Sequence, residues 1–226
     1  DAGIASFVST NAFDLLASVN LAGRDGLRGG MLDVAMPDMV VSRSAAPAAG
    51  KGQVSLDRLN SIGASSILLG GTRENSADGV TVTRKADAVS LVSTAATEGG
   101  SDELSTTGEL LVVAKKSVKV DDGLRVASTG ADTGDSRRYV IKGDGATLLV
   151  SNLSKTELSV TNVSATPSGD LEVGKAALPG SVQLSGNAVQ LDATGNLSID
   201  PNTRITTGSL GLGTQRVAVG ASASDK

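Results

Sequence analysis

Pairs of aliphatic residues spaced two positions apart recur along most of this chain. In residues 181–200 (SVQLSGNAVQLDATGNLSID), three such pairs occur, and Gly, Asn or Asp interrupts the pattern after each one. Alternation with a period of two is typical of β-strands that bury one face. Gly, Asn and Asp are residues that favour turns. The pattern therefore predicts many strands of about three to five residues joined by tight turns.

The same alternation predicts strands along the whole chain, separated by short segments that contain Gly, Asn, Asp or Pro. The expected strands are 15–21, 31–35, 39–42, 66–69, 80–83, 88–92, 110–113, 118–120, 124–127, 138–142, 147–150, 158–160, 171–173, 182–184, 189–191, 197–199, 205–207, 210–212 and 217–219.

One short helix is expected at residues 55–63 (SLDRLNSIG). Ser55 can act as the N-cap, because its hydroxyl can accept a hydrogen bond from a backbone N–H of the first turn. Three aliphatic residues spaced three positions apart share one face, and Gly63 can end the helix.

Three segments follow one approximate repeat of roughly 17 to 25 residues. Residues 108–128, 169–186 and 195–213 each open with Gly, a polar residue and Leu, followed two positions later by an aliphatic residue and then by a turn. A short strand with one apolar face buries too little surface alone. Strands stacked as successive turns of a coil pair about 4.8 Å apart and share a continuous core. The expected fold is all-β, a right-handed parallel β-helix (β-solenoid) with loop insertions; a β-sandwich is the competing fold.

We expect residues 1–226 to form a single continuous β-solenoid segment of a longer protein, because the chain begins DAGIASF without an initiator Met or a signal peptide. Three polar stretches rich in small residues interrupt the strand pattern: 44–53, 97–108 and 128–138. They are expected to project from the coil as loops, where binding functions often reside.

Composition excludes several chemistries. Hydrophobic residues make up 39% of the chain, but the aromatic residues are only Phe7, Phe13 and Tyr139, so the core must be aliphatic. The absence of Cys and His removes thiol nucleophiles, disulfides, His-centred triads and the usual zinc sites. A net charge of −4 without a long basic run gives no reason to expect nucleic acid. No apolar run is long enough to predict membrane insertion as a helix.

Acidic residues are the main candidates for chemistry. Paired carboxylates can serve glycoside hydrolysis, and carboxylates with carbonyl oxygens can bind Ca²⁺. The pairs here sit in Gly-rich turns, where Asp commonly bonds to local backbone, so turn formation is the favoured role. We therefore assign no catalytic, cofactor-binding or metal-binding residue and expect no cofactor. The pairs considered are Asp102 with Glu103, Asp121 with Asp122, and Asp132 with Asp135; the turns considered for Ca²⁺ are 121–123, 131–135 and 143–145.

A basic pair, Arg137 and Arg138 in SRRY (136–139), is the remaining candidate, as a docking spot for an anionic glycan. A solvated strand start is the favoured interpretation of this pair, because single surface arginines are common on exposed strands.

Several stretches, taken in order, resemble the filamentous haemagglutinin-like exoproteins of Gram-negative bacteria, the secreted partners of two-partner secretion. The resemblance rests on LDRLNSIGASSILLGGTR (56–73), STTGELLVVAKKSVKVDDGLRVASTG (105–130), GDGATLLVSN (143–152) and the segment 169–213. It covers most of residues 50–220 and only loosely residues 1–50.

This resemblance implies a secreted shaft segment of a long adhesin at the bacterial cell surface, exported through an outer-membrane pore partner. The implied functions are adhesion, aggregation and biofilm matrix assembly, with self-association into filaments and an unidentified glycan or receptor as partners. No enzymatic activity is expected. The alternatives are a carbohydrate-active or glycan-binding β-helix of the tailspike or lyase kind, and the stalk of a contact-dependent toxin-delivery protein.

Overall fold

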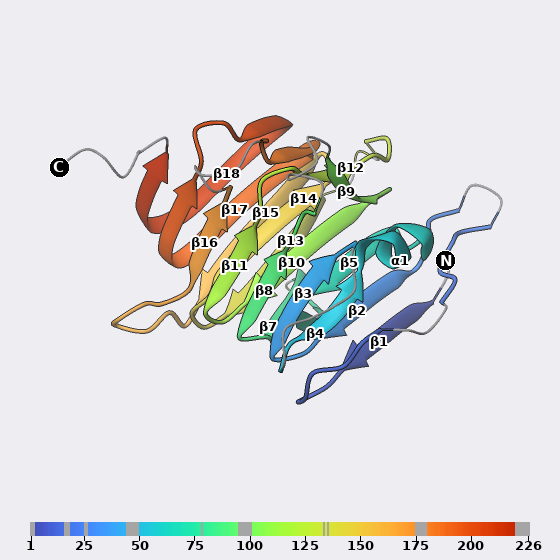
Figure 1. The fold of residues 1–226 in the computed structure, drawn as a ribbon, viewed down its shortest axis with the longest axis horizontal. Helices are drawn as coiled ribbons and strands as arrows, with labels where there is room; N and C mark the ends of the chain where they lie inside the picture. Colours follow the sequence, from blue (N-terminus) through green and yellow to red (C-terminus); the bar gives the residue numbers. More distant parts are fainter. Residues whose placement is uncertain are drawn as a thin grey trace.

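The computed structural model describes residues 3–15, 19–24, 27–43, 50–77, 79–94, 101–132, 134, 136–174 and 180–219. In this part of the chain the protein is all-β with one short helix, which confirms the predicted class (Figure 1). The elements are β1 (Ile4–Val8), β2 (Met31–Ala35), β3 (Asp38–Ser42), β4 (Gly52–Ser55), α1 (Leu56–Ser61), β5 (Ser66–Leu69), β6 (Gly71–Ser76), β7 (Gly79–Arg84), β8 (Ala88–Leu91), β9 (Asp102–Thr106), β10 (Glu109–Ala114), β11 (Ser117–Val120), β12 (Leu124–Ser128), β13 (Ser136–Lys142), β14 (Ala146–Ser151), β15 (Lys155–Thr161), β16 (Asp170–Val173), β17 (Gln183–Ile199) and β18 (Arg204–Val219).

Most strands belong to one 14-stranded sheet that curls into a half-barrel, with β1 at one end of the molecule and β18 at the other (Figure 1). The strands form three rows. The first row is β1, β2, β5, β10 and β14; the second is β4, β3, β8, β11 and β16; the third is β9 and β12. Within a row the pairing is parallel except at β14, which is antiparallel to β10. The sheet is therefore mixed.

β17 joins all three rows. Its residues 183–185 pair in parallel with β12, residues 188–193 pair antiparallel with β14, and residues 197–199 pair in parallel with β16. β18 then runs parallel to β17 along nearly its whole length, with each residue paired to one roughly 20 positions earlier in the chain. A single register shift, between Ala193 and Asn196, interrupts this pairing.

A second, four-stranded sheet of β15, β13, β7 and β6 packs against the first row, and the sequence did not predict it as a separate layer. Its β6 and β7 form an antiparallel hairpin. Tyr139 and Ile141 of β13 pack against Leu111 of β10 and Leu149 of β14 in a cluster between the two sheets. β5, β10 and β14 are consequently buried on both faces, which explains their continuous apolar runs.

The main core is aliphatic, as the composition predicts. Side chains of all three rows meet there, including Leu32, Val89, Val118 and Val126, each with no exposed surface. Because successive side chains of a strand point to opposite faces, each short strand supplies one or two of these residues.

Helix α1 confirms the predicted helix. The Ser55 hydroxyl accepts a hydrogen bond from the Arg58 N–H at 3.5 Å, so Ser55 is the N-cap residue. Leu56 and Leu59 are buried, and Gly63 follows the helix with a φ of +72°. A left-handed φ of this kind is the usual reason for Gly at the end of a helix.

Most predicted strands lie within strands of the structure, but the prediction of a strand at 15–21 is wrong. Its described residues, 15 and 19–21, are not in a strand, although Leu15 and Leu21 are buried. They are apolar because they cover one end of the core. Four strands were not predicted, namely β1, β4, β6 and β9.

The three segments expected as projecting loops each include residues of a strand. Gly52 begins β4, residues 102–106 form β9, and Ser136 begins β13. Residues 44–49, 97–100, 133 and 135 of these segments lie outside the described residues.

Candidate functional site

A cluster of charged side chains lies buried between the two sheets, at the start of the first-row strands. Ser66 and Glu109 are the first residues of β5 and β10, and the parallel register places them directly opposite each other. Arg73 reaches the cluster from β6, and Arg137 and Tyr139 reach it from β13. Strands from both sheets therefore supply one polar cluster.

Glu109 is the centre of this cluster, with a side chain that is 4% exposed. Its Oε1 accepts a hydrogen bond from the Ser66 hydroxyl at 2.8 Å and forms an ion pair with Arg137. Its Oε2 accepts a hydrogen bond from the Tyr139 hydroxyl. Arg73 lies 3.9 Å from Oε1, measured from its Nη1. Both carboxylate oxygens are thus occupied by donors of the protein itself.

Arg73 also binds the second buried carboxylate, Asp33 of β2. The Arg73 Nε donates to Asp33 Oδ1 at 2.7 Å, and the Arg73 backbone N–H donates to Asp33 Oδ2 at 3.3 Å. The Arg73 Nη2 donates to the carbonyl oxygen of Leu32 at 3.2 Å. The side chains of Arg73 and Asp33 are 7% and 4% exposed, so this ion pair is almost fully desolvated.

Burial shifts the protonation equilibria of the cluster. Burial raises the pKa of the Tyr139 hydroxyl well above its ordinary value, and the adjacent Glu109 charge raises it further. The pKa of Asp33 is raised because burial outweighs the favourable charge and hydrogen bonds of Arg73. Burial opposes the charged form of Arg137, but Glu109 and Tyr139 raise its pKa overall. Tyr139 therefore remains a neutral hydrogen-bond donor.

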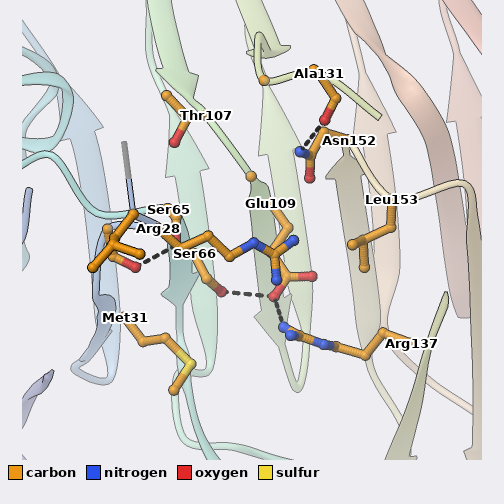
Figure 2. A pocket seen from close by; sticks show the side chains of 14 residues that line it. Arg28, Met31, Ser65, Ser66, Thr107, Glu109, Ala131, Arg137, Asn152 and Leu153 are labelled. Carbon is orange, nitrogen blue, oxygen red and sulfur yellow. Dashed lines mark hydrogen bonds and ion pairs between the residues drawn. The ribbon is translucent and has the colours of Figure 1, made fainter. Parts of the chain in front are cut away.

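An open pocket of about 460 Å³ adjoins this cluster (Figure 2). Leu27, Met31 and Leu153 contribute apolar surface to it. Figure 2 shows the Arg28 side chain extended across the pocket toward Glu109, with Arg137 approaching from the other side.

Asn152 forms the far wall of the pocket. The Asn152 Nδ2 donates to the backbone carbonyl of Ala131 at 2.8 Å, and the backbone carbonyl of Asn152 accepts from Asn187 Nδ2 at 2.7 Å. Asn152 Oδ1 is buried without a hydrogen-bond partner among the described residues. The pocket thus combines apolar surface, two arginines and one buried acceptor.

A second buried arginine, Arg84 at the end of β7, bridges the sheets at the opposite end of the first-row strands. Its Nη1 donates to the Gly143 carbonyl at 2.8 Å, and its Nη2 donates to the Thr147 hydroxyl at 3.0 Å. Burial lowers the pKa of Arg84 to about 10, opposed by the charges of Asp192 and Asp144. Burial raises the pKa of Asp192, and the charge of Arg84 limits that rise.

The arrangement around Glu109 is suited to holding the sheets together. A carboxylate that acts as a general base or nucleophile must reach a substrate atom. Glu109 instead has its oxygens directed at Ser66, Arg137 and Tyr139.

The acidic pairs considered from the sequence do not come together as one site. Asp102 is fully buried, where its Oδ2 accepts from the Thr94 N–H at 2.9 Å and its Oδ1 lies 3.0 Å from Arg43. Glu103, next in the chain, pairs with Arg125 at 3.3 Å. Their alternation along β9 directs the two carboxylates to opposite faces.

The acidic residues of the turns bond locally or to a neighbouring turn. Asp132 accepts from the Gly134 N–H at 2.9 Å, and Asp144 accepts from the Ser164 N–H at 2.9 Å. Asp122 is buried at 2% exposure, and Asp135 lies outside the described residues. In the described part of the chain, no three acidic side chains are close enough to hold a metal ion.

Arg137, expected as a solvated strand start, is instead committed to Glu109, while Arg138 is exposed. Asp33, Arg73 and Glu109 were not predicted from the sequence. Their only signal is a charged residue beside an aliphatic run, which does not distinguish a buried ion pair from a solvated strand.

Comparison with protein-family models, with curated proteins and with solved structures returns no match to this chain. Within the residues that the structure describes, no helix is long and apolar enough to cross a membrane.

Proposed function

We propose that this chain is a structural and adhesive segment of a secreted bacterial surface filament, of the filamentous haemagglutinin-like kind. The observation that carries the proposal is the pairing of β17 with β18. Fourteen residue pairs along these strands are in parallel register at an offset of roughly 20 residues. A chain that repeats its path beside itself in this way extends along one axis by adding similar turns.

The finer fold that we propose is a right-handed parallel β-helix carrying insertions. Parallel rows that stack β2, β5 and β10, and β3, β8, β11 and β16, support it. In this interpretation the hairpin of β6 and β7, together with β13 and β15, is an insertion that folds back on the outside of the coil. The antiparallel β14 returns the chain from that layer to the first row.

The buried clusters around Glu109 and Arg84 support a mechanical role, because they join the two sheets. Glu109 and Arg84 each tie the outer sheet to the first row: both oxygens of Glu109 accept from donors of the protein, and the two terminal nitrogens of Arg84 donate to Gly143 and Thr147. The long ladder of backbone hydrogen bonds gives the rod stiffness. Export through an outer-membrane pore partner and location at the cell surface rest on the family resemblance of residues 50–220.

Deleting the gene from cells that carry it tests this proposal. We expect the deletion strain to lose cell aggregation and attachment to surfaces, and complementation to restore both. Purified protein should leave bacterial polysaccharides at their original chain length. Unchanged aggregation and attachment, together with depolymerisation of a polysaccharide, would instead establish the carbohydrate-active alternative.

A further inference from the structure

The pocket beside the Glu109 cluster has the size of a small-molecule site. Its volume is about 460 Å³, within the range of roughly 300 to 1,000 Å³ that such sites occupy. Strands of the first row supply Met31, Ser66 and Glu109 to its walls, and the outer sheet supplies Arg137 (Figure 2). The polar cluster that joins the two sheets therefore borders an open cavity.

The charges that line this pocket do not balance. Among the described residues of its walls, Arg28 and Arg137 are cationic and Glu109 alone is anionic, so two positive charges face one negative charge. The neighbouring Arg73 and Asp33 form an ion pair at 2.7 Å and cancel each other. Excess charge in a partly buried site is costly unless a counter-charge is present. One negative charge on a ligand would balance the pocket.

The two arginines can bind that charge without breaking the Glu109 cluster. Arg137 pairs with Glu109 through its Nη1, and its side chain is 30% exposed. A guanidinium carries five N–H groups and binds carboxylates with two parallel hydrogen bonds. Arg28 is exposed, and Figure 2 shows its side chain extended across the pocket. A carboxylate between Arg28 and Arg137 would therefore contact donors from both sides.

The remaining walls favour an aliphatic ligand. Leu27, Met31 and Leu153 line the pocket, and Leu27 is 62% exposed. Figure 2 shows Met31 and Leu153 on opposite sides of the arginines. An aliphatic chain laid on these residues would remove apolar surface from water. No aromatic ring lines the pocket in the described part of the chain, so a sugar ring has no platform on which to stack.

We propose that this pocket binds a small aliphatic carboxylate, a short hydrocarbon chain that ends in a single carboxylate group. The carboxylate lies between Arg28 and Arg137, and the chain packs on Leu27, Met31 and Leu153.

The charge of the ligand follows from the same count. A doubly charged group such as phosphate would exceed the positive charge of the walls and would be repelled by the nearby carboxylate of Glu109. A neutral aliphatic molecule would leave the excess positive charge unbalanced. A single carboxylate meets both conditions.

Hexanoate is the probe, and the methionines of the chain report where it binds. The chain contains three methionines. Met31 lines the pocket, whereas Met36 and Met39 are buried in the main core at 0% and 1% exposure. With the methionine methyl groups labelled with carbon-13, nuclear magnetic resonance should give one signal for each, and a Met31→Leu variant identifies the signal of Met31.

We expect hexanoate to shift the Met31 signal in a saturable way and to leave the Met36 and Met39 signals in place. The dissociation constant should be about 1 mM or below, as for other ligands of this size. A Met31 signal that does not move at up to ten times that concentration would overturn the proposal.

Two related compounds separate the contributions of the arginines and of the apolar walls. Hexanamide has the same chain without the charge, and acetate has the charge without the chain. Each should bind at least tenfold more weakly than hexanoate, because each lacks one of the two interactions. Hexanamide or acetate that binds as tightly as hexanoate would contradict the proposed recognition.

Arg28→Gln removes one of the two cations at an exposed position and should weaken hexanoate binding at least tenfold. Arg24→Gln is the control, because Arg24 is four positions earlier, is also exposed and is not among the described residues that line the pocket. Equal affinities of the two variants for hexanoate would refute the role of Arg28 and with it the proposed site.

Circular dichroism should establish that both variants are folded; the three compounds, tested on the native chain, decide the question if Arg28→Gln is not. Binding is measured on the purified chain, and attachment and aggregation are measured on cells. Failure of the site would therefore leave the proposed function standing, and failure of the proposed function would leave the site standing.

Discussion

Glu109 is the residue at which the contact between the two sheets converges. Its oxygens accept from Ser66 of the inner sheet and from Arg137 and Tyr139 of the outer one. Replacing a buried ion pair with apolar residues can be neutral, but removing one partner leaves the other charge buried and uncompensated. Removing the charge of Glu109 should therefore destabilise the folded state more than removing the charge of an exposed Glu.

Glu109→Gln should lower the free energy of unfolding by about 3 kcal/mol or more, because Arg137 and Arg73 lose their shared counter-charge. Urea denaturation measures the change. Glu172→Gln is the control, since Glu172 pairs with Lys119 at 3.2 Å on the surface and should cost less than about 1 kcal/mol. Equal losses in the two variants would show that the Glu109 cluster contributes no more than a surface pair.

Asp192 predicts a specific dependence of stability on pH. Burial raises its pKa in the folded state, so the folded protein holds this proton at pH values where the unfolded chain has released it. Its contribution is therefore complete below the ordinary pKa of 3.8 and is lost as pH rises through the higher folded pKa. The stability of the native chain relative to Asp192→Asn should fall as pH rises through this window.

Asp87 provides the control of opposite sign. The hydrogen bond from Lys116 lowers the pKa of Asp87, so the contribution of Asp87 is present above its ordinary pKa and is lost as pH falls through the lower folded pKa. Urea denaturation at a series of pH values should therefore give difference curves of opposite slope for Asp192→Asn and Asp87→Asn. Parallel curves would contradict the assigned burial of Asp192.

The residues of the Glu109 cluster could not be found from the sequence. Asp33, Arg73, Glu109 and Arg137 are spread over more than a hundred positions, and they meet only because the outer sheet folds back over the first row. The prediction that Arg137 is solvated is wrong because nothing local distinguishes SRRY from an exposed strand start. By contrast, Ser55 and Gly63 were assigned correctly, because a helix cap depends on residues within one turn.

Gly70, between β5 and β6, shows why the corners between elements require Gly. Its φ is +87°, and an added Cβ would lie 1.9 Å from the carbonyl oxygen of Val113 in β10. Gly143 has a similar φ, +83°, but an added Cβ there has no neighbour within 4 Å. An Ala substitution at Gly143 therefore adds backbone strain alone, whereas an Ala substitution at Gly70 adds both backbone strain and steric overlap.

Gly143→Ala should cost about 1 to 2 kcal/mol of unfolding free energy, the cost of a left-handed conformation for a residue with a Cβ. Gly70→Ala should cost clearly more, because the backbone of β10 must also move. Thermal and urea denaturation of both variants measure the difference. A Gly70 variant no less stable than the Gly143 variant would contradict the close approach of β5 and β10 at this corner.

Strands were predicted correctly where alternating aliphatic residues are buried in the core. β11 (SVKV) and β16 (DLEV) bury two aliphatic residues each, and both were predicted. β6 (GTRENS) was missed because it lies in the outer sheet and its later residues are exposed. Residues 15–21 were assigned wrongly because Leu15 and Leu21 are buried at the end of the core without joining a sheet.

At the scale of the molecule, the order of the strands was predictable only where the chain repeats locally. The segment 181–200, with its three pairs of aliphatic residues, lies mainly in β17. Successive aliphatic pairs of this segment lie in stretches that pair with β12, β14 and β16. This agrees with a path that turns at each Gly-rich interruption. The antiparallel β14 and the outer sheet depend on packing between residues far apart in sequence, such as Leu68 and Tyr139, which share one apolar cluster; a local pattern carries no information about such packing.

Electron microscopy of the intact protein isolated from the cell surface tests the central claim most directly. A structural shaft built from turns like β17 and β18 should appear as a long, thin and unbranched fibre of constant width, with the epitope of residues 1–226 located along it or at its end. A compact particle, or a short trimeric spike, would contradict the proposed function.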